Sequence, residues 1–353
     1  MSYPDILNKT HFNREDIIRL LNAEGEEVLL LKKKAKEVLI KECGNEIYLR
    51  GLIEISNACD FDCYYCGLRK SNQDLERYYL SQEEIIDTAQ LCARKGFGSL
   101  VLQCGQNSNP EFVGFIEKVI IDIKQATTSK LLPNGLGITL SFGEQNMQTY
   151  KRWLEAGAHR YLLRIEASNP QLFAKIHPPY QKYEHRLHCI RHLNQNGWQA
   201  GSGVMIGIPG QTIEDLADDI LFFKNENIGM LGMGPYLLHP DTPMFSNIDW
   251  WNNNTKEIAT LALKMIATTR IVLKDVNIAS TTALETIMPN GRELGLEHGA
   301  NVYMPLLTPE SKRELYGIYS GKPASDTKLV CPADRRIAFN EWGDAKHYKR
   351  KHN

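Results

Sequence analysis

Eight short apolar runs recur along this chain, and stretches with helical periodicity separate them. The runs are residues 49–56, 99–104, 137–142, 160–166, 201–207, 230–234, 276–281 and 301–305. Strands that alternate with helices form parallel sheets, and eight such units suit a closed barrel. The order of the elements therefore predicts an α/β fold, a complete (β/α)8 barrel of the TIM type.

Helix-start signals divide the chain into three parts. Asn13 precedes two acids, and Ser81 with Glu84 has the capping-box pattern, as does Thr212 with Asp215. We expect a helical extension over 1–45, the barrel over 46–322, and a C-terminal segment over 323–353 that packs on the barrel or trails from it. Because residues 347–352 are mostly basic and polar, we expect that end to be solvated.

Composition limits the kinds of binding partner and the cellular compartment expected for this chain. The net charge is −1, so nothing favours binding to nucleic acid or to a membrane surface, and no apolar run is long enough to span a bilayer. The N-terminus lacks the apolar core of a signal peptide. Eight cysteines in 353 residues do not make a secreted disulfide scaffold, and five are scattered singly. These features predict a cytoplasmic protein.

Three cysteines lie close together directly after the first predicted strand. Cys59, Cys63 and Cys66 are spaced by three and then two residues, so they could hold three corners of an iron–sulfur cube and leave one iron open. Active sites of such barrels lie at this end of the strands. The alternative is a structural zinc site, which needs a fourth ligand; no histidine lies between His11 and His159.

The cysteine spacing, with Tyr65 just before the third cysteine, resembles the signature of the radical S-adenosylmethionine (SAM) superfamily. The resemblance implies one 4Fe–4S cluster whose open iron chelates the amino and carboxylate groups of SAM. One electron would then cleave SAM to a 5′-deoxyadenosyl radical. Tyr65 would pack near the adenine of the bound SAM.

Polar residues follow the next strands. Gly105 would let the backbone approach a ligand closely, and the superfamily resemblance implies a contact with the SAM amino group there. Thr139 and Ser141 share one face of the third strand, where their hydroxyls could bind a ribose or satisfy each other.

The fourth predicted strand carries three charges on one face. Arg160, Arg164 and Glu166 have the same parity, and such charges are costly to bury unless they are paired or bound. One interpretation is an internal ion pair. In the other, which we favour, Glu166 holds the SAM amine or ribose while an arginine binds a substrate carboxylate.

Longer stretches resemble one branch of the superfamily, the HydE maturases of FeFe hydrogenases. The stretches are 63–69, 160–164, 207–212, 234–243 and 299–305, within a similarity that runs over about 16–322. The resemblance implies SAM contacts at Glu166, Arg186 and Met230. It implies that the substrate region is lined by Arg160, Arg164, Thr281, Thr282, Ala283, Tyr316 and Tyr319. The implied substrate is a cysteine-bound iron carbonyl–cyanide unit delivered by HydG. HydF and a reductant such as flavodoxin or ferredoxin would be further partners.

The chain departs from the family pattern near these sites. Gln106 stands where the family has glutamate, and Ile165 and Glu285 are also changed. Cys331 stands alone where some members have three cysteines, so we expect no second cluster. A paralogue with another small substrate is therefore an alternative. A methylornithine-synthase-like mutase is disfavoured, because Ala283 replaces an acidic residue. The non-enzyme alternative is an iron–sulfur electron-transfer or scaffold protein.

Overall fold

Parallel strands close on themselves in the computed structural model, which describes residues 2–323 and 331–343. The strands of the ring are β1 (Glu46–Glu54), β2 (Ser99–Gln103), β3 (Gly137–Ser141), β4 (Arg160–Leu162), β5 (Gln199–Ser202), β7 (Met230–Leu231), β9 (Asn277–Ser280) and β10 (Val302–Tyr303). Each pairs in parallel with the next, and β10 pairs with β1 through Tyr48–Val302 and Leu49–Tyr303. The predicted (β/α)8 barrel is confirmed.

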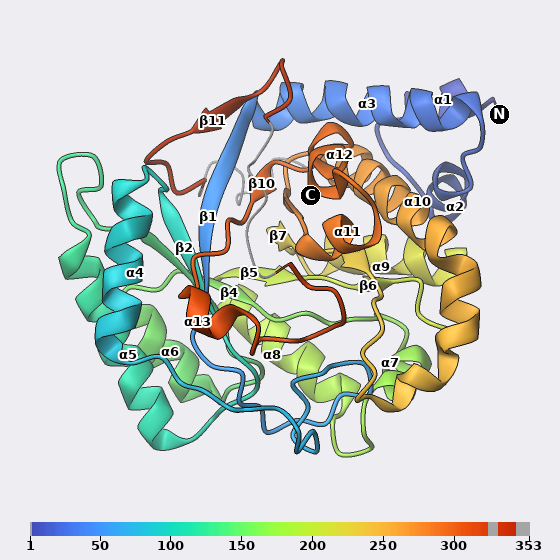
Figure 1. Ribbon diagram of the computed structural model, residues 1–353. Coiled ribbons are helices and arrows are strands. Elements are labelled where there is room, and N and C mark those ends of the chain that lie inside the picture. Colours follow the sequence, from blue (N-terminus) through green and yellow to red (C-terminus); the bar gives the residue numbers. More distant parts are fainter. Residues whose placement is uncertain (1, 324–330, 344–353) are drawn as a thin grey trace.

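Helices surround this ring on the outside (Figure 1). They are α1 (Tyr3–Leu7), α2 (Arg14–Leu21), α3 (Glu26–Cys43), α4 (Gln82–Arg94), α5 (Pro110–Ala126), α6 (Met147–Glu155), α7 (Pro170–Ile176), α8 (Tyr183–Gln195), α9 (Ile213–Asn225), α10 (Ile248–Leu273), α11 (Thr282–Ile287), α12 (Gly291–Glu297) and α13 (Glu310–Arg313), with a 3-10 turn at Pro243–Asn247. Ser81 and Thr212 form the predicted capping boxes, and Asn13, predicted as an N-cap, forms one with Asp16. Across the described part of the chain, the helices include none that combines the length and apolar character of a membrane span.

Two of the predicted strands divide after a few residues. The fifth gives β5 and then β6 (Met205–Ile206), and the sixth gives β7 and then β8 (Gly234–Pro235), which pairs with β6. Two glycines lie at the division, and a Cβ added to Gly203 would come within 2.1 Å of the Gly232 carbonyl oxygen. The strands therefore pass too closely for a side chain at Gly203, whereas a Cβ at Gly232 would meet no atom within 4 Å.

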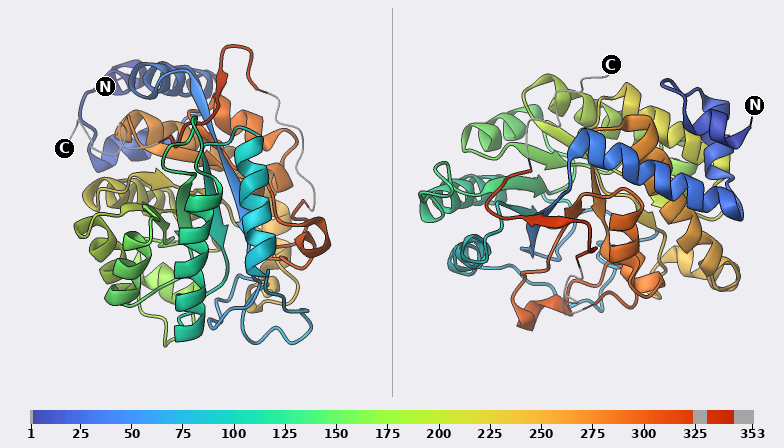
Figure 2. Two further views of the ribbon diagram at one scale, coloured as in Figure 1. Left: turned by 90° about the vertical axis from the view of Figure 1, so that its left-hand side faces the viewer. Right: turned by 90° about the horizontal axis from the view of Figure 1, so that it is seen from above.

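The amino-terminal end of the barrel is covered by chain from both termini. Helix α3 lies across the end where β1 begins (Figures 1 and 2), and β11 (Arg336–Ala338) pairs with residues 46–48 of β1. The carbonyl oxygen of Gly343 accepts hydrogen bonds from Arg160 (3.1 Å) and Arg50 (3.4 Å). Residues 331–343 therefore pack against the barrel; the basic stretch 347–352 lies outside the described residues.

Strand parity separates the core from the barrel interior. Ile138 and Leu140 on β3 are fully buried in the main hydrophobic core. Thr139 and Ser141, with the opposite parity, face the interior, and Ser141 reaches a pocket at the carboxyl end. The strands thus place polar side chains inside the barrel.

Candidate functional site

A pocket opens at the carboxyl end of the barrel, and the three clustered cysteines lie in its wall. Residues from several strand ends complete it: Gln103, Gly105, Gln106, Ser141, Arg164, Glu166, Arg186, Ala283, Tyr316 and Tyr319. The pocket therefore combines thiols, charges of both signs and aromatic rings within one cavity, as small-molecule sites commonly do.

Backbone hydrogen bonds fix the cysteine loop to three other segments. The N–H groups of Asp60, Tyr64 and Gly67 donate to the carbonyls of Gln106 (2.9 Å), Ile176 (3.0 Å) and Ile318 (3.0 Å). Gly105 allows the first of these approaches, because a Cβ there would lie 2.5 Å from Cys59 Cβ and from the Ala58 carbonyl oxygen. The loops after β1 and β2 are thus interlocked, and only glycine fits at 105.

The donor set suits a cluster better than a single ion. Cys59, Cys63 and Cys66 are free thiols, and Cys59 Sγ accepts N–H groups from Phe61 (3.4 Å) and Gln106 (3.3 Å). Burial, with a contribution from Cys59, raises the pKa of the Cys63 thiol to about 11, so bound positive charge would be needed to hold these sulfurs as thiolates. Within 2–323 and 331–343, no three His, Cys, Asp or Glu side chains converge on one metal position. A 4Fe–4S cluster distributes its ligands over several irons, so the residues fit it, and the described residues do not supply the ligand set of the zinc alternative.

Glu166 enters the pocket from a strained backbone. Its φ of 66° lies in the left-handed region, which costs of order 1–3 kcal/mol for a residue other than glycine. Its N–H donates to Gly203 and its carbonyl accepts from Met205, so the neighbouring segment maintains this conformation. The carboxylate pairs with Arg164 at 2.9 Å. Arg164 and Glu166 therefore form an ion pair that is also exposed to the pocket.

Arg186 reaches the pocket from α8 and is oriented by Glu144, an acid that we did not predict. Its Nε donates to Glu144 Oε1 at 2.5 Å, and its Nη1 donates to the Arg164 carbonyl at 2.6 Å. Nη2 has no hydrogen-bond partner within the described chain. The side-chain amide of Gln106 in turn bonds both backbone groups of Glu144, each at 2.6 Å. Arg186 thus presents one fixed edge that is available to an anion.

Two tyrosines of the pocket wall lie on a segment near the C-terminus that covers the pocket. Tyr316 and Tyr319 follow α13, and the Tyr316 hydroxyl accepts from Gln103 Nε2 at 3.1 Å. Lys322, at the end of this segment, forms a buried ion pair with Glu54 on β1. Burial raises the pKa of Glu54 and lowers that of Lys322, so each depends on the other for its charge. We name residues 314–322 the covering segment.

Most of the predicted site residues meet in this pocket. Tyr65 lies in its wall and packs edge-on against His177, with ring centroids 5.5 Å apart. The other predicted residues in the wall are Gly105, Ser141, Glu166, Arg186, Arg164, Ala283, Tyr316 and Tyr319. Thr281 and Thr282 are half-buried where α11 begins and are not in the wall; a Cβ on the wall residue Gly234 would come within 2.7 Å of Thr281 Oγ1.

Three further predicted residues lie outside the wall of this pocket, at other heights in the barrel. Arg160 begins β4 and donates to the carbonyls of Trp342 (2.7 Å) and Gly343 at the other end of the barrel. Met230 begins β7, and its sulfur accepts from Arg50 at 2.6 Å. Thr139 is fully buried two residues before Ser141, and its hydroxyl makes no protein hydrogen bond in the described structure. Strand parity predicts the face of a side chain but not its height along the barrel axis.

Comparison with known families matches the first half of the barrel. A family model for the radical SAM superfamily covers residues 53–223. The FeFe hydrogenase maturase subunit HydE of Thermotoga maritima is 43% identical over 318 residues, which is 90% of this chain and 86% of that protein. The 3-methylornithine synthase of Methanosarcina acetivorans is 27% identical, over 88% of this chain and 83% of that protein.

Solved structures give the same architecture at lower identity. Methylornithine synthase superimposes with a TM-score of 0.74 at 24% identity, covering 86% of this chain and 85% of that one. The FeFe-hydrogenase maturase HydG superimposes with a TM-score of 0.73 at 16% identity, covering 91% and 70%. At these identities the two structures support the fold alone.

Proposed function

This chain belongs to the radical SAM superfamily as a HydE-like enzyme, and we propose that it acts in the maturation of the active-site cluster of an FeFe hydrogenase. The family implies a 4Fe–4S cluster and SAM as cofactors. The relative with 43% identity over 90% of this chain is a maturase of that kind, which supports the assignment. We infer that the substrate is a small carboxylate-bearing molecule, the cysteine-bound iron carbonyl–cyanide unit.

The residues of the pocket divide into cofactor and substrate groups in this proposal. Cys59, Cys63 and Cys66 hold the cluster, which with SAM supplies reductive cleavage to a 5′-deoxyadenosyl radical. The free edge of Arg186 binds the SAM carboxylate, and the Glu166 carboxylate accepts from the SAM amine or ribose. The two charged side chains are held in position before SAM binds. Glu144 orients Arg186, and the Gly203 carbonyl maintains the backbone of Glu166.

The substrate lies deeper in the pocket in this account. Arg164 bonds Glu166 through Nε and Nη2, and Nη2 also donates to the Val204 carbonyl at 3.0 Å, so Nη1 is the group that binds a substrate carboxylate. Tyr316 and Tyr319 on the covering segment exclude water from this space. Ala283, the wall residue that follows the half-buried threonines Thr281 and Thr282, lies at the other end of the substrate in this proposal.

One observation carries the proposal: three thiols and an arginine with an unpaired edge line the same cavity at the carboxyl end of the barrel. A cluster alone would suit electron transfer. A fixed anion site beside the cluster supports chemistry on a bound small molecule, which distinguishes an enzyme from a scaffold.

We further propose the wider setting of the reaction. The barrel over 46–322 carries the chemistry, while the helical extension predicted over 1–45 and the C-terminal segment predicted over 323–353 contribute residues 2–45 and 331–343 to the closure of its other end. Cys331 is a single thiol whose Sγ contacts the Arg335 carbonyl at 3.3 Å, so we expect one cluster only. HydG would supply the substrate, HydF would receive the product, and a cytoplasmic flavodoxin or ferredoxin would supply the electron.

Genetic replacement tests this function. In a host whose FeFe hydrogenase depends on HydE, this chain is expected to restore hydrogen production when it replaces that gene, and Cys63→Ala is expected to abolish the effect. If the wild-type chain holds its cluster and cleaves SAM but restores no hydrogenase, the maturation proposal is wrong and a paralogue with another substrate is indicated.

A further inference from the structure

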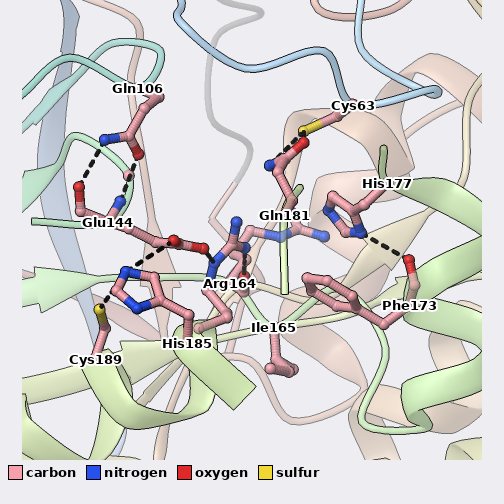
Figure 3. A network of polar contacts seen from close by, with 12 residues as sticks. Cys63, Gln106, Glu144, Arg164, Ile165, Phe173, His177, Gln181, His185 and Cys189 are labelled. Carbon is pink, nitrogen blue, oxygen red and sulfur yellow. Dashed lines mark hydrogen bonds and ion pairs between the residues drawn. The ribbon is translucent and has the colours of Figure 1, made fainter. Parts of the chain in front are cut away.

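Gln181 brings a side-chain amide to one of the three cysteines. Its Nε2 lies 3.5 Å and its Oε1 3.6 Å from Cys63 Sγ, and the residue is only 5% exposed (Figure 3). Across the described residues this amide has no other side-chain or backbone partner. A buried amide that contacts only a sulfur indicates a role at that sulfur, because buried polar groups otherwise find stronger partners.

Ligation decides which amide atom faces the sulfur. In the free protein the Cys63 thiol can donate to Oε1 or accept from Nε2. A cysteine bound to iron has lost its proton and can only accept. The amide N–H therefore becomes the donor when a cluster is bound.

The segment between α7 and α8 holds this amide in place. The Gln181 N–H donates to the Pro178 carbonyl at 3.0 Å, which closes a turn that contains two prolines. The Tyr64 N–H donates to the Ile176 carbonyl at the end of α7, also at 3.0 Å. The turn and the cysteine loop are thus bonded to each other, so the distance from amide to sulfur is set by the fold.

The donors at Cys59 and Cys63 differ in kind. Cys59 receives backbone N–H groups from Phe61 and Gln106, which substitution cannot remove. Cys63 receives a side-chain N–H, which substitution can remove without changing the backbone. Hydrogen bonds to cysteine sulfurs stabilise the added electron of a reduced iron–sulfur cluster and so raise its reduction potential.

We propose that Gln181 is a positioning residue that donates to Cys63 sulfur and raises the reduction potential of the 4Fe–4S cluster. The inference depends on the proposed function only in requiring that cluster. By this account Gln181 brings the cluster within reach of a weak one-electron donor.

Potentiometric titration of the reconstituted holoprotein without SAM, followed by electron paramagnetic resonance, tests the proposal. Gln181→Leu removes the N–H, and its midpoint potential is expected to lie below that of the wild type. Gln181→Glu replaces the donor with a carboxylate and is expected to lie lower still. The control Gln199→Leu removes another glutamine side chain, at the start of β5 at the far end of the barrel, and is expected to leave the potential unchanged.

The outcomes separate the hydrogen bond from a structural role. A potential that is unchanged in Gln181→Leu at full iron content overturns the proposal. A second measurement covers variants that do not retain iron: in the reduced wild type with glutamine labelled by ¹⁵N at the side-chain amide, pulsed resonance is expected to detect a nitrogen coupling to the cluster, and its absence also overturns the proposal. A wild-type protein that forms no cluster or cleaves no SAM would instead contradict the proposed function.

Discussion

The two ends of the barrel both bury arginines, but they satisfy them differently. At the amino end, Arg160 is fully buried and donates to the carbonyls of Trp342 and Gly343. At the carboxyl end, Arg186 is equally well held by Glu144 and the Arg164 carbonyl, yet its Nη2 has no partner in the described chain. A buried charge is therefore not by itself evidence of function, and an unused donor that faces a cavity is the informative feature.

Backbone strain alone does not divide the two ends. A left-handed backbone occurs at Glu166 in the pocket, and also at Lys274 before β9 and at Asn340 in the segment that closes the amino end. Of these three residues, Glu166 is the one that lines the pocket, where maintained strain is expected to serve a function. The amino end is thus built for closure and the carboxyl end for binding.

The largest effect is expected from removing the cysteine thiols at the carboxyl end of the barrel. Cys63→Ala or Cys66→Ala is expected to lose the cluster and all SAM cleavage, since two thiolates cannot hold the cube. The folded state should persist in Cys63→Ala, because Cys63 lies in the pocket wall and outside the main hydrophobic core, whereas Cys66 packs against that core. Iron content and thermal unfolding check both points. The control is Cys331→Ser, which should keep about four irons per chain; a loss of iron there would contradict our expectation of a single cluster.

The second largest effect is expected from breaking the ion pair between Glu54 and Lys322 of the covering segment. Lys322→Met leaves Glu54 buried without its partner and is expected to reduce the free energy of unfolding by about 3–5 kcal/mol at pH 8. Urea unfolding measures this loss. The double variant Glu54→Gln with Lys322→Met should recover most of it, because no unpaired charge remains. Equal losses in the single and double variants would show that the charge pairing is not the cause.

Replacing Arg186 or Arg160 with methionine tests the difference between the two ends of the barrel directly. Arg186→Met is expected to weaken SAM binding about 10- to 100-fold, the effect of losing a charged hydrogen bond of about 1.5–3 kcal/mol. Arg160→Met should leave SAM binding unchanged and lower stability, since the Trp342 carbonyl loses this donor. Arg186→Met should also lower stability, because Glu144 stays buried without its arginine partner. Calorimetric titration of SAM therefore distinguishes the two variants, and urea unfolding measures the stability of each. A loss of SAM affinity in Arg160→Met would contradict the division of the barrel.

The smallest effect concerns a buried acid outside both ends. Burial raises the pKa of Asp219 on α9 from 3.8 to about 7, while its Oδ1 accepts from the Ser168 N–H at 2.7 Å. The folded state therefore holds this proton more tightly than the unfolded state, and stability falls as the pH rises from about 4 to 7. Asp219→Asn keeps an oxygen that accepts from the Ser168 N–H but cannot titrate. The loss in the free energy of unfolding between pH 5 and 8 should therefore be about 2 kcal/mol smaller in this variant. If the variant and the wild type lose stability in parallel over that range, Asp219 is not the titrating group.

The sequence predicted those parts of the site that local pattern determines. The cysteine spacing identified the loop, and strand order placed it at the carboxyl end. Arg164 and Glu166 follow from parity together with their late position in the predicted strand. Arg160 has the same parity but lies at the other end, because height along the axis depends on the stagger of the whole sheet.

Other contacts had no local signal. Glu54 and Lys322 pair across 268 residues, and Gln181 meets Cys63 across 118. Glu144 was visible at the end of the third predicted strand, but nothing in the sequence indicated that Arg186 lies beside it. Such pairs become apparent only when the barrel brings separate strand ends together.

The central claim is that the three thiols and the arginine at the carboxyl end form one SAM site. The direct measurement is the yield of 5′-deoxyadenosine from anaerobically reconstituted protein with SAM and dithionite. We predict 5′-deoxyadenosine from the wild type and from Arg160→Met, with none from Cys63→Ala and a reduced yield from Arg186→Met at low SAM concentration. If the wild type carries a reduced 4Fe–4S cluster and yet forms no 5′-deoxyadenosine, the pocket is not a SAM-cleaving site and the account is wrong.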